Sequence, residues 1–290
     1  MRKIKILVLS FCFLGCFQDR ITPSELLDYT ERMVLNGTID TDKAIGIEIT
    51  NSSSATDPLL PRLVKNADVV MVRNKDEISL TFNEFTETYT TSETVASGDA
   101  ITLRVNHPNY PNANASFKMP QEISASGSFI KEGGVDADGD PGDLITVTFT
   151  DDANRNNYYQ LNFYYFNETI SQFIPMAFET SDPSLLDYNS YKLNDGSVLF
   201  SDELFNGKEK ALSTVAPFGI VAFNTGNKYL IEISSISEDL FKYHKSLQRA
   251  EDAKEITFQA GYNNAVVIHS NVTSGLGILG ASSSNSIILK

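Results

Sequence analysis

The sequence predicts an all-β protein, with an N-terminal immunoglobulin-like sandwich followed by a second, larger β-rich domain that carries one or two short helices. Two observations support this fold class. Segments such as 45–49 and 78–82 alternate apolar with other residues, which is typical of strands with one buried face. Turn-forming residues separate these segments at short intervals, for example at 51–54 and 97–99, as in an antiparallel sandwich.

The predicted division of the chain falls near Pro120. We expect the sandwich over residues 25–120 and the second β-rich domain over residues 121–290, because a proline-rich corner and a polar acidic stretch follow the early strands. The chain contains no Trp and no Cys beyond residue 16, so the likeness to immunoglobulin domains concerns strand pattern and size alone.

The second domain is expected to contain strands and one clear helix. An aromatic run at 158–166 reads as a central strand, and further strands are expected at 219–223, 255–258 and 265–269. Apolar residues recur at helical spacing from Leu240 onward, and Ser237 is suited to be the N-cap. We therefore predict a helix from residue 237 to about residue 250.

The first sixteen residues indicate export and lipid attachment. Arg2, Lys3 and Lys5 precede a short apolar run at 6–14, which is too short to span a bilayer. Gly15 then precedes Cys16, as in a bacterial lipobox, so residues 1–16 are predicted to be a lipoprotein signal segment with Cys16 as the lipidated residue. The alternative is an uncleaved anchor or ordinary secretion.

Composition excludes several classes of function. Cleavage before Cys16 would leave 20 Lys and Arg residues against 37 Asp and Glu residues, a net charge of −17, so binding to nucleic acid is disfavoured. Both cysteines lie in the signal segment, so a disulfide framework and a cysteine-based metal site or nucleophile are not expected.

An acidic stretch after the boundary offers the one candidate metal site. Carboxylates at alternate positions, with glycines between them, favour calcium. The candidate ligands are Asp136, Asp138, Asp140 and Asp143. An EF-hand is excluded, because Pro141 stands where its glycine belongs and Val147 where its bidentate glutamate belongs. The alternative is a solvated acidic linker that binds no ion, and the cofactor prediction is therefore none or calcium.

No catalytic constellation stands out. Asp151 and Asp152 form a pair of carboxylates suited to acid–base work, but the Asn residues that follow them favour a turn. The three histidines, His107, His244 and His269, have no second histidine or cysteine at ligand spacing. The prediction is a protein that is not an enzyme, without catalytic residues.

Two places could bind a partner or a ligand. Tyr158 and Tyr164 belong to the aromatic run and could stack on sugars or form a binding hot spot, although filling a sandwich core is the simpler interpretation. Gly275 and Gly277 lie in a glycine-rich tail, where they allow a bulge or close backbone approach, or provide an edge for docking.

Five segments, in this order, together resemble a known family of bacterial lipoproteins. They are 33–37, 98–105, 147–152 with 157–159, 200–208 and 270–281. Together they resemble the Bacteroidetes outer-membrane lipoproteins grouped as domain-of-unknown-function family 4249, over most of the chain from about residue 32.

This resemblance implies a location and a class of partner. It implies a lipid-anchored, surface-exposed protein of the outer membrane that acts as a non-catalytic accessory or ligand-binding partner of a TonB-dependent transporter. Two alternatives stay open: a surface hydrolase of extracellular polymers that uses Asp151 and Asp152, and a structural component of the envelope.

Overall fold

The computed structural model describes residues 29–54, 61–136, 138–177, 180, 182–185, 190–193, 196–221, 224, 226, 228–260 and 266–290, and the predicted signal segment with Cys16 lies outside them. The all-β prediction is confirmed, since the chain folds into a 13-stranded and a 3-stranded sheet. The first part of the chain supplies β1 (Met33–Asp40), β2 (Ile45–Asn51), β3 (Asp68–Arg73), β4 (Asp76–Asn83), β5 (Thr88–Thr91), β6 (Ala100–His107) and β7 (Tyr110–Lys118).

The rest of the chain supplies the remaining strands and the helices. The strands are β8 (Ala125–Val135), β9 (Pro141–Thr150), β10 (Tyr158–Asn167), β11 (Gln172–Met176), β12 (Ser190–Lys192), β13 (Val198–Ser201), β14 (Glu209–Ala216), β15 (Tyr229–Ile236) and β16 (Leu276–Leu289). The helices are the short η3 (Pro183–Leu185) and α1 (Phe218–Val221), and the longer α2 (Glu238–Ala260).

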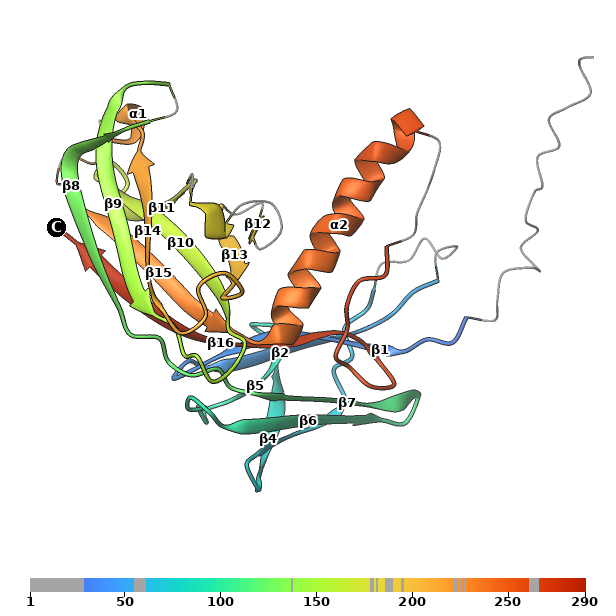
Figure 1. Cartoon of the computed structure of the whole chain (residues 1–290). Coiled ribbons are helices and arrows are strands. Elements are labelled where there is room, and N and C mark those ends of the chain that lie inside the picture. Colours follow the sequence, from blue (N-terminus) through green and yellow to red (C-terminus); the bar gives the residue numbers. More distant parts are fainter. Residues whose placement is uncertain are drawn as a thin grey trace, which may run out of the picture.

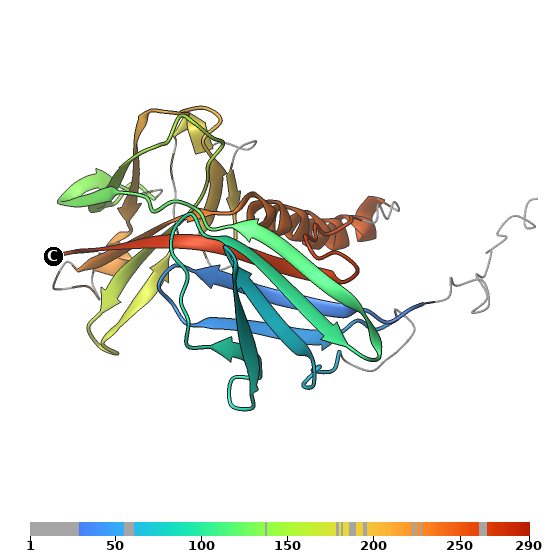
Figure 2. The same ribbon diagram turned by 90° about the horizontal axis from the view of Figure 1, so that it is seen from below.

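The 13-stranded sheet consists of two sheets that share β16. The first half of β16, from Leu276 to Ser282, pairs in parallel with β1. Its second half, from Ser282 to Leu289, pairs antiparallel with β15, on the other side of the strand. Figures 1 and 2 show this long strand extending from one part of the molecule into the other. The last strand of the chain therefore belongs to both sandwiches.

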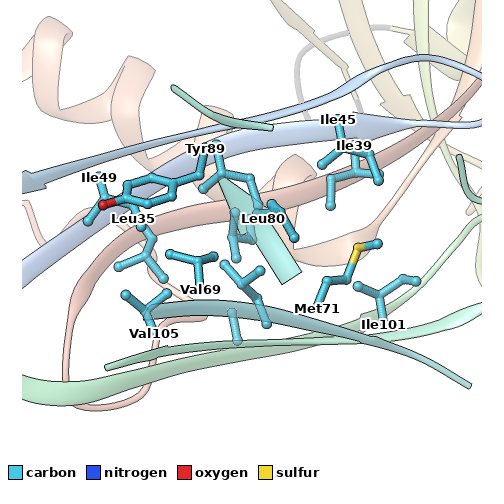
Figure 3. Close-up of a cluster of buried hydrophobic side chains, with 14 of the residues drawn as sticks. Leu35, Ile39, Ile45, Ile49, Val69, Met71, Leu80, Tyr89, Ile101 and Val105 are labelled. Carbon is cyan, nitrogen blue, oxygen red and sulfur yellow. The ribbon is translucent and has the colours of Figure 1, made fainter. Parts of the chain in front are cut away.

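The N-terminal sandwich encloses an apolar core. Alternate residues of its strands point inward, so that Leu35, Ile47, Met71 and Leu103 are fully buried. Figure 3 shows Leu35 and Met71 among the buried side chains that meet between the strands. Tyr89 adds a polar group, because its hydroxyl donates to the Val64 carbonyl oxygen at 2.8 Å and accepts from a backbone N–H.

The C-terminal sandwich packs the three-stranded sheet β14–β9–β8 against the β10–β15 sheet. Large aromatic residues fill the space between these two sheets, with Phe149 from one sheet and Phe163, Phe200 and Tyr229 from the other. Apolar residues of the two sandwiches form separate clusters, apart from the contribution of 272–281 to the first. The predicted boundary at residue 120 stays a prediction, because β16 serves both sides.

Helix α2 begins where the sequence predicts and ends later. Ser237 caps it, since its hydroxyl oxygen accepts the N–H of Leu240 at 3.4 Å. The helix then continues to Ala260, so the strand predicted at 255–258 is wrong. Of the strand predicted at 219–223, residues 219–221 are helical, and residues 222 and 223 lie outside the described residues. No strand forms over 266–269 either, and residue 265 lies outside the described residues.

The base of α2 packs on the body of the molecule, and Figure 1 shows its far end directed away from the strands. Leu240 and Phe241 are buried there with Leu199, Ile236 and Ile278, a group that we call the joint cluster. Within the described residues, no helix has the length and apolar character needed to cross a bilayer.

Candidate ligand-binding groove at Tyr158

Two hollows lie on the surface beside the base of α2, and both are lined by Asn156 and Tyr158. One, of about 520 Å³, is bounded by the loop after β13 and by Phe241, Lys242 and Lys245 of α2. The other, of about 460 Å³, is bounded by residues 117–121, 155–158 and 235–239. We call the two together the Tyr158 groove. Its walls come from the linker after β7, the start of β10 and the first turns of α2.

Tyr158 is the aromatic side chain at the centre of this groove. Its ring packs against that of Phe241, with the ring centroids 4.9 Å apart and the planes tilted by 36°. Burial, followed by the nearby Glu238 carboxylate, raises the pKa of Tyr158 to about 12. The hydroxyl therefore stays protonated at neutral pH, and the half-buried ring offers both an apolar face and a hydrogen-bonding end.

The next residue, Tyr159, points to the opposite side of the strand, into the core. Its hydroxyl donates a short hydrogen bond to the carboxylate of Asp151, which is 5% exposed. The same carboxylate accepts the N–H of Gly207 at 2.7 Å and the side-chain amide of Asn157 at 3.0 Å. Three donors from two segments, 157–159 and the loop at Gly207, thus compensate the burial of Asp151.

Asn157 connects the two loops that border the groove. Its amide nitrogen has four acceptors around it: carboxylate oxygens of Asp151 at 3.0 Å and Asp202 at 3.3 Å, and the carbonyl oxygens of Asp152 at 2.9 Å and Arg155 at 3.2 Å. Its backbone N–H also donates to Asp202 at 2.9 Å. Because Asn157 directly precedes Tyr158, this lock of Asp151, Asn157 and Asp202 fixes the start of β10 at the groove.

An aromatic cluster supports the lock from below. The ring of Tyr159 lies 5.1 Å from that of Phe149 and 5.4 Å from that of Phe200, and Phe205 packs against all three. These rings come from the segments 147–152, 157–159 and 200–208, which are three of the segments that carry the family resemblance. The structure brings these motifs together, and their shared role is to hold one corner of the sandwich.

The predicted pair Asp151 and Asp152 does not act as a unit. Asp152 lies in the exposed turn, where hydrogen bonds from Arg155 and Asn154 lower its pKa to about 2. Asp151 is buried, with both oxygens occupied. The carboxylate that lies close to Asp151 is that of Asp202, which accepts from the same Asn157 amide. Burial raises the pKa of Asp202. The predicted turn accounts for the exposed Asp152. The burial of Asp151 was not predicted, because nothing in the local sequence distinguishes two adjacent aspartates.

The acidic stretch is split between surface and core. Asp136 accepts the N–H groups of Asp138 and Asp140 at 3.0 and 2.9 Å, which closes a turn. Asp143 is fully buried, and it accepts the hydroxyl of Tyr229 at 2.7 Å and a backbone N–H at 2.9 Å. Within the described residues, no group of three or more His, Cys, Asp or Glu could hold a metal ion. Calcium binding stays a prediction.

A larger hollow of about 850 Å³ adjoins this turn, between Asp136, Val215 and Asp182. The carboxylate of Asp182 in its lining is engaged, because the Lys210 amine contacts both of its oxygens at 2.7 Å. We place the candidate site at the Tyr158 groove despite the greater volume here, because the Tyr158 groove combines aromatic, amide and charged side chains on a fixed frame.

The other predicted surface residues lie apart from the groove. Tyr164 shares the face of β10 that carries Tyr158, but its hydroxyl donates to Glu232 at 2.9 Å. Gly275 is buried, and a side chain on it would press on the carbonyl oxygen of Met33. Gly277 lies equally close to β1, so the predicted close backbone approach is confirmed, and β1 occupies that edge.

The fold and the groove define a class: an all-β protein of two joined sandwiches with a surface groove beside a protruding helix. The family model for a domain of unknown function (DUF4249) matches residues 20–288, and the chain belongs to this family. The resemblance described from the sequence motifs is thereby confirmed. No curated protein matches the chain.

Solved structures offer distant likenesses. A candidate carbohydrate-binding protein from Bacteroides uniformis is 9% identical, with a TM-score of 0.22, over 83% of this chain and 97% of its own. A candidate membrane-anchored protein from Corynebacterium diphtheriae is 12% identical, with a TM-score of 0.20, over 87% of this chain and 60% of its own. At this similarity neither likeness bears on function.

Proposed function

We propose that the protein is a non-catalytic lipoprotein of the outer membrane, tethered through Cys16, that binds a ligand in the Tyr158 groove as an accessory of a TonB-dependent transporter. The Tyr158 groove is the observation that supports ligand binding. The tether is supported by the sequence around Cys16. The partner class follows from the resemblance to outer-membrane lipoproteins. Cys16 lies outside the residues that the structure describes.

The lining of the groove favours an uncharged, hydroxyl-rich ligand. Its charged groups balance, because the lining holds four basic residues (Lys118, Arg155, Lys242 and Lys245) and four acidic ones (Asp202, Glu203, Glu238 and Asp239). Lys242 pairs with Glu238 at 2.8 Å. Asn156 and Asn206 add amide groups that both donate and accept hydrogen bonds. Next to them, Tyr158 presents an aromatic ring. A neutral carbohydrate chain matches this set, since its C–H face packs on the ring and its hydroxyls reach the amides.

Binding of neutral hexasaccharides tests this part of the proposal. We expect calorimetry with maltohexaose, cellohexaose, xylohexaose and mannohexaose to detect binding of at least one, and Tyr158→Ala to weaken it about tenfold or more, the worth of one aromatic anchor. Tyr164→Ala is the matched control, because it removes a tyrosine of the same strand face outside the groove. Equal losses in the two variants, or no binding of any sugar, would contradict the carbohydrate assignment.

Labelling and purification test the tether and the partner. Radiolabelled palmitate should enter the unmodified chain and not Cys16→Ser. Purification of the chain from detergent-extracted membranes should recover a TonB-dependent barrel, and Cys16→Ser should recover less of it. If the chain binds sugar but no TonB-dependent barrel is recovered with it, the protein is a binding protein of the envelope and not an accessory of a transporter. Shortening of the hexasaccharides by the unmodified chain would instead favour the hydrolase.

A further inference from the structure

The two sandwiches are joined at one position of β16. Ser282 pairs with Asp40 on one side of the strand and with Ile236 on the other, and it is the residue at which the two pairings meet. The other connection is short. Met119 is buried in the N-terminal core and Ile123 in the C-terminal core, so three residues cross between them. Figure 1 shows the sandwiches on either side of this crossing.

Small polar side chains line the joint at residues 282–284, next to the apolar joint cluster. The Ser283 hydroxyl lies 3.2 Å from that of Thr41 and 3.4 Å from that of Ser97. The Ser284 hydroxyl accepts from Ser234 at 2.9 Å and donates to Asp40 at 2.9 Å. Hydroxyl groups can exchange partners through rotation, whereas an interdigitated apolar core resists shear.

One buried atom at the joint lacks a partner. The second carboxylate oxygen of Asp40, Oδ1, is inaccessible to solvent and has no hydrogen-bond partner among the described residues. A buried acceptor without a donor is costly, so this arrangement of the joint does not satisfy its own polar groups. A change in the angle between the sandwiches is one way to satisfy that oxygen.

The Tyr158 groove spans this joint. Its hollow of about 460 Å³ has one wall from residues 117–121, where the N–H of Met119 donates to the Asp99 carbonyl oxygen at 2.8 Å in the N-terminal sandwich. The opposite wall consists of residues 155–158 and 235–239 of the C-terminal part. A ligand in this hollow therefore touches both sandwiches at once. The joint cluster includes Ile236, the partner of Ser282, and so lies near the same axis.

We propose that the two sandwiches rotate relative to each other about Ser282, and that a ligand in the groove clamps them at one angle. The rotation stands on the joint alone, whereas the clamping rests on the proposed binding of carbohydrate at Tyr158. Such a movement would let the N-terminal sandwich report the occupancy of the groove.

Distances between spin labels test the rotation. Cys12 and Cys16 are the only cysteines of the sequence, so the chain with Cys12→Ser and Cys16→Ser accepts a unique pair of labels. Lys75→Cys with Glu168→Cys places one label on each sandwich, at exposed positions away from the groove. Lys75→Cys with Asn109→Cys is the control within one sandwich. We expect the first pair to give a distance distribution about twofold broader than the control in the ligand-free chain.

Added hexasaccharide should narrow and shift the distribution of the first pair and leave the control unchanged. Tyr158→Ala should abolish this response and keep the ligand-free width. If the distance distribution of the first pair without ligand is as narrow as that of the control, the proposed rotation is overturned. If the distribution of the first pair is broad and a bound hexasaccharide leaves it unchanged, the clamping is overturned, although sugar binding stands. If no hexasaccharide binds, the ligand-free width still decides the rotation, and calorimetry separately decides the carbohydrate assignment.

Discussion

The two sandwiches build their interiors from different chemistry. Among the described residues up to Met119, the buried polar side chains around the apolar core of the N-terminal sandwich are Asn51 and Ser52. The C-terminal sandwich buries three carboxylates, on Asp143, Asp151 and Asp202, each of which is held by a tyrosine hydroxyl or an asparagine. Buried carboxylates cost stability unless they are fully paired, so their presence indicates a need for fixed loop geometry. Two of the three, Asp151 and Asp202, hold the loops beside the Tyr158 groove through Asn157.

Substitution of Asp151 is expected to have the largest effect on the C-terminal interior. Asp151→Ala leaves the hydroxyl of Tyr159, the N–H of Gly207 and the amide of Asn157 without their shared acceptor. We expect the free energy of unfolding to fall by about 3 kcal/mol or more, because three buried neutral donors lose their acceptor at about 1–3 kcal/mol each, measured by urea denaturation. Sugar binding should weaken as well, because the lock no longer fixes the start of β10.

Asp152→Ala is the matched control for that change. Asp152 is the adjacent aspartate, but it lies in the exposed turn and bonds to Arg155 and Asn154. Its loss should leave the urea midpoint close to that of the unmodified chain. Equal losses for the two variants would show that the buried lock contributes no more than a surface turn.

The shared strand offers a second way to test the comparison. Gly277 has a φ of +96°, and an added Cβ would overlap the carbonyl oxygen of Leu35 on β1. Gly139 has a φ of +91°, but an added Cβ there meets no atom within 4 Å. Gly139→Ala should therefore cost only the conformational strain, about 1–2 kcal/mol, and Gly277→Ala clearly more, because β1 or β16 must shift.

Thermal unfolding monitored separately for each sandwich would locate the effect of Gly277→Ala. We expect the loss to appear first in the N-terminal sandwich, to which β1 belongs, and to reach the C-terminal sandwich through β16. A similar loss for the two glycine variants would mean that β1 tolerates displacement, and that the first half of β16 is not tightly held.

Local pattern predicted the strands well and the connections poorly. The alternation at 45–49 and 78–82 marks strands because one face of each is buried in a single core. Ser237 marks the helix start because capping is a local interaction. The β-branched pair within 255–258 suggested a strand, but α2 continues through it, and propensity is a weak guide beside the cooperativity of an established helix.

The candidate site was predicted in part for the same reason. Tyr158 was identified from the aromatic run, and the motifs around Asp151 and Asp202 were recognised as separate pieces. Their meeting at Asn157 depends on contacts across 45 residues of chain, which no spacing rule contains. The exchange of partners at Ser282 is equally long-range, because β1 and β15 are both distant in sequence from β16.

Alkaline pH provides the finest test of the two interiors. Burial raises the pKa of Tyr89 in the N-terminal sandwich, and it raises the pKa of Tyr159 and of Tyr229 in the C-terminal one, where Asp151 and Asp143 add to the effect. Tyr158 reaches a pKa of about 12. A raised folded-state pKa contributes stability that is complete below the unfolded-state pKa of 10.0, and this stability is lost as pH rises through the folded-state value.

Stability should therefore stay level up to about pH 10 and then fall, with each buried tyrosine adding at most about 1.4 kcal/mol per pH unit to the slope. Tyr229→Phe should make the decline shallower by removing one such group, measured as the change in urea midpoint between pH 9 and pH 11. The slope is the informative quantity, because the lost hydrogen bond to Asp143 lowers stability at every pH. An unchanged slope in Tyr229→Phe would mean that this hydroxyl ionises as readily folded as unfolded, and that the C-terminal interior is wetter than its packing implies.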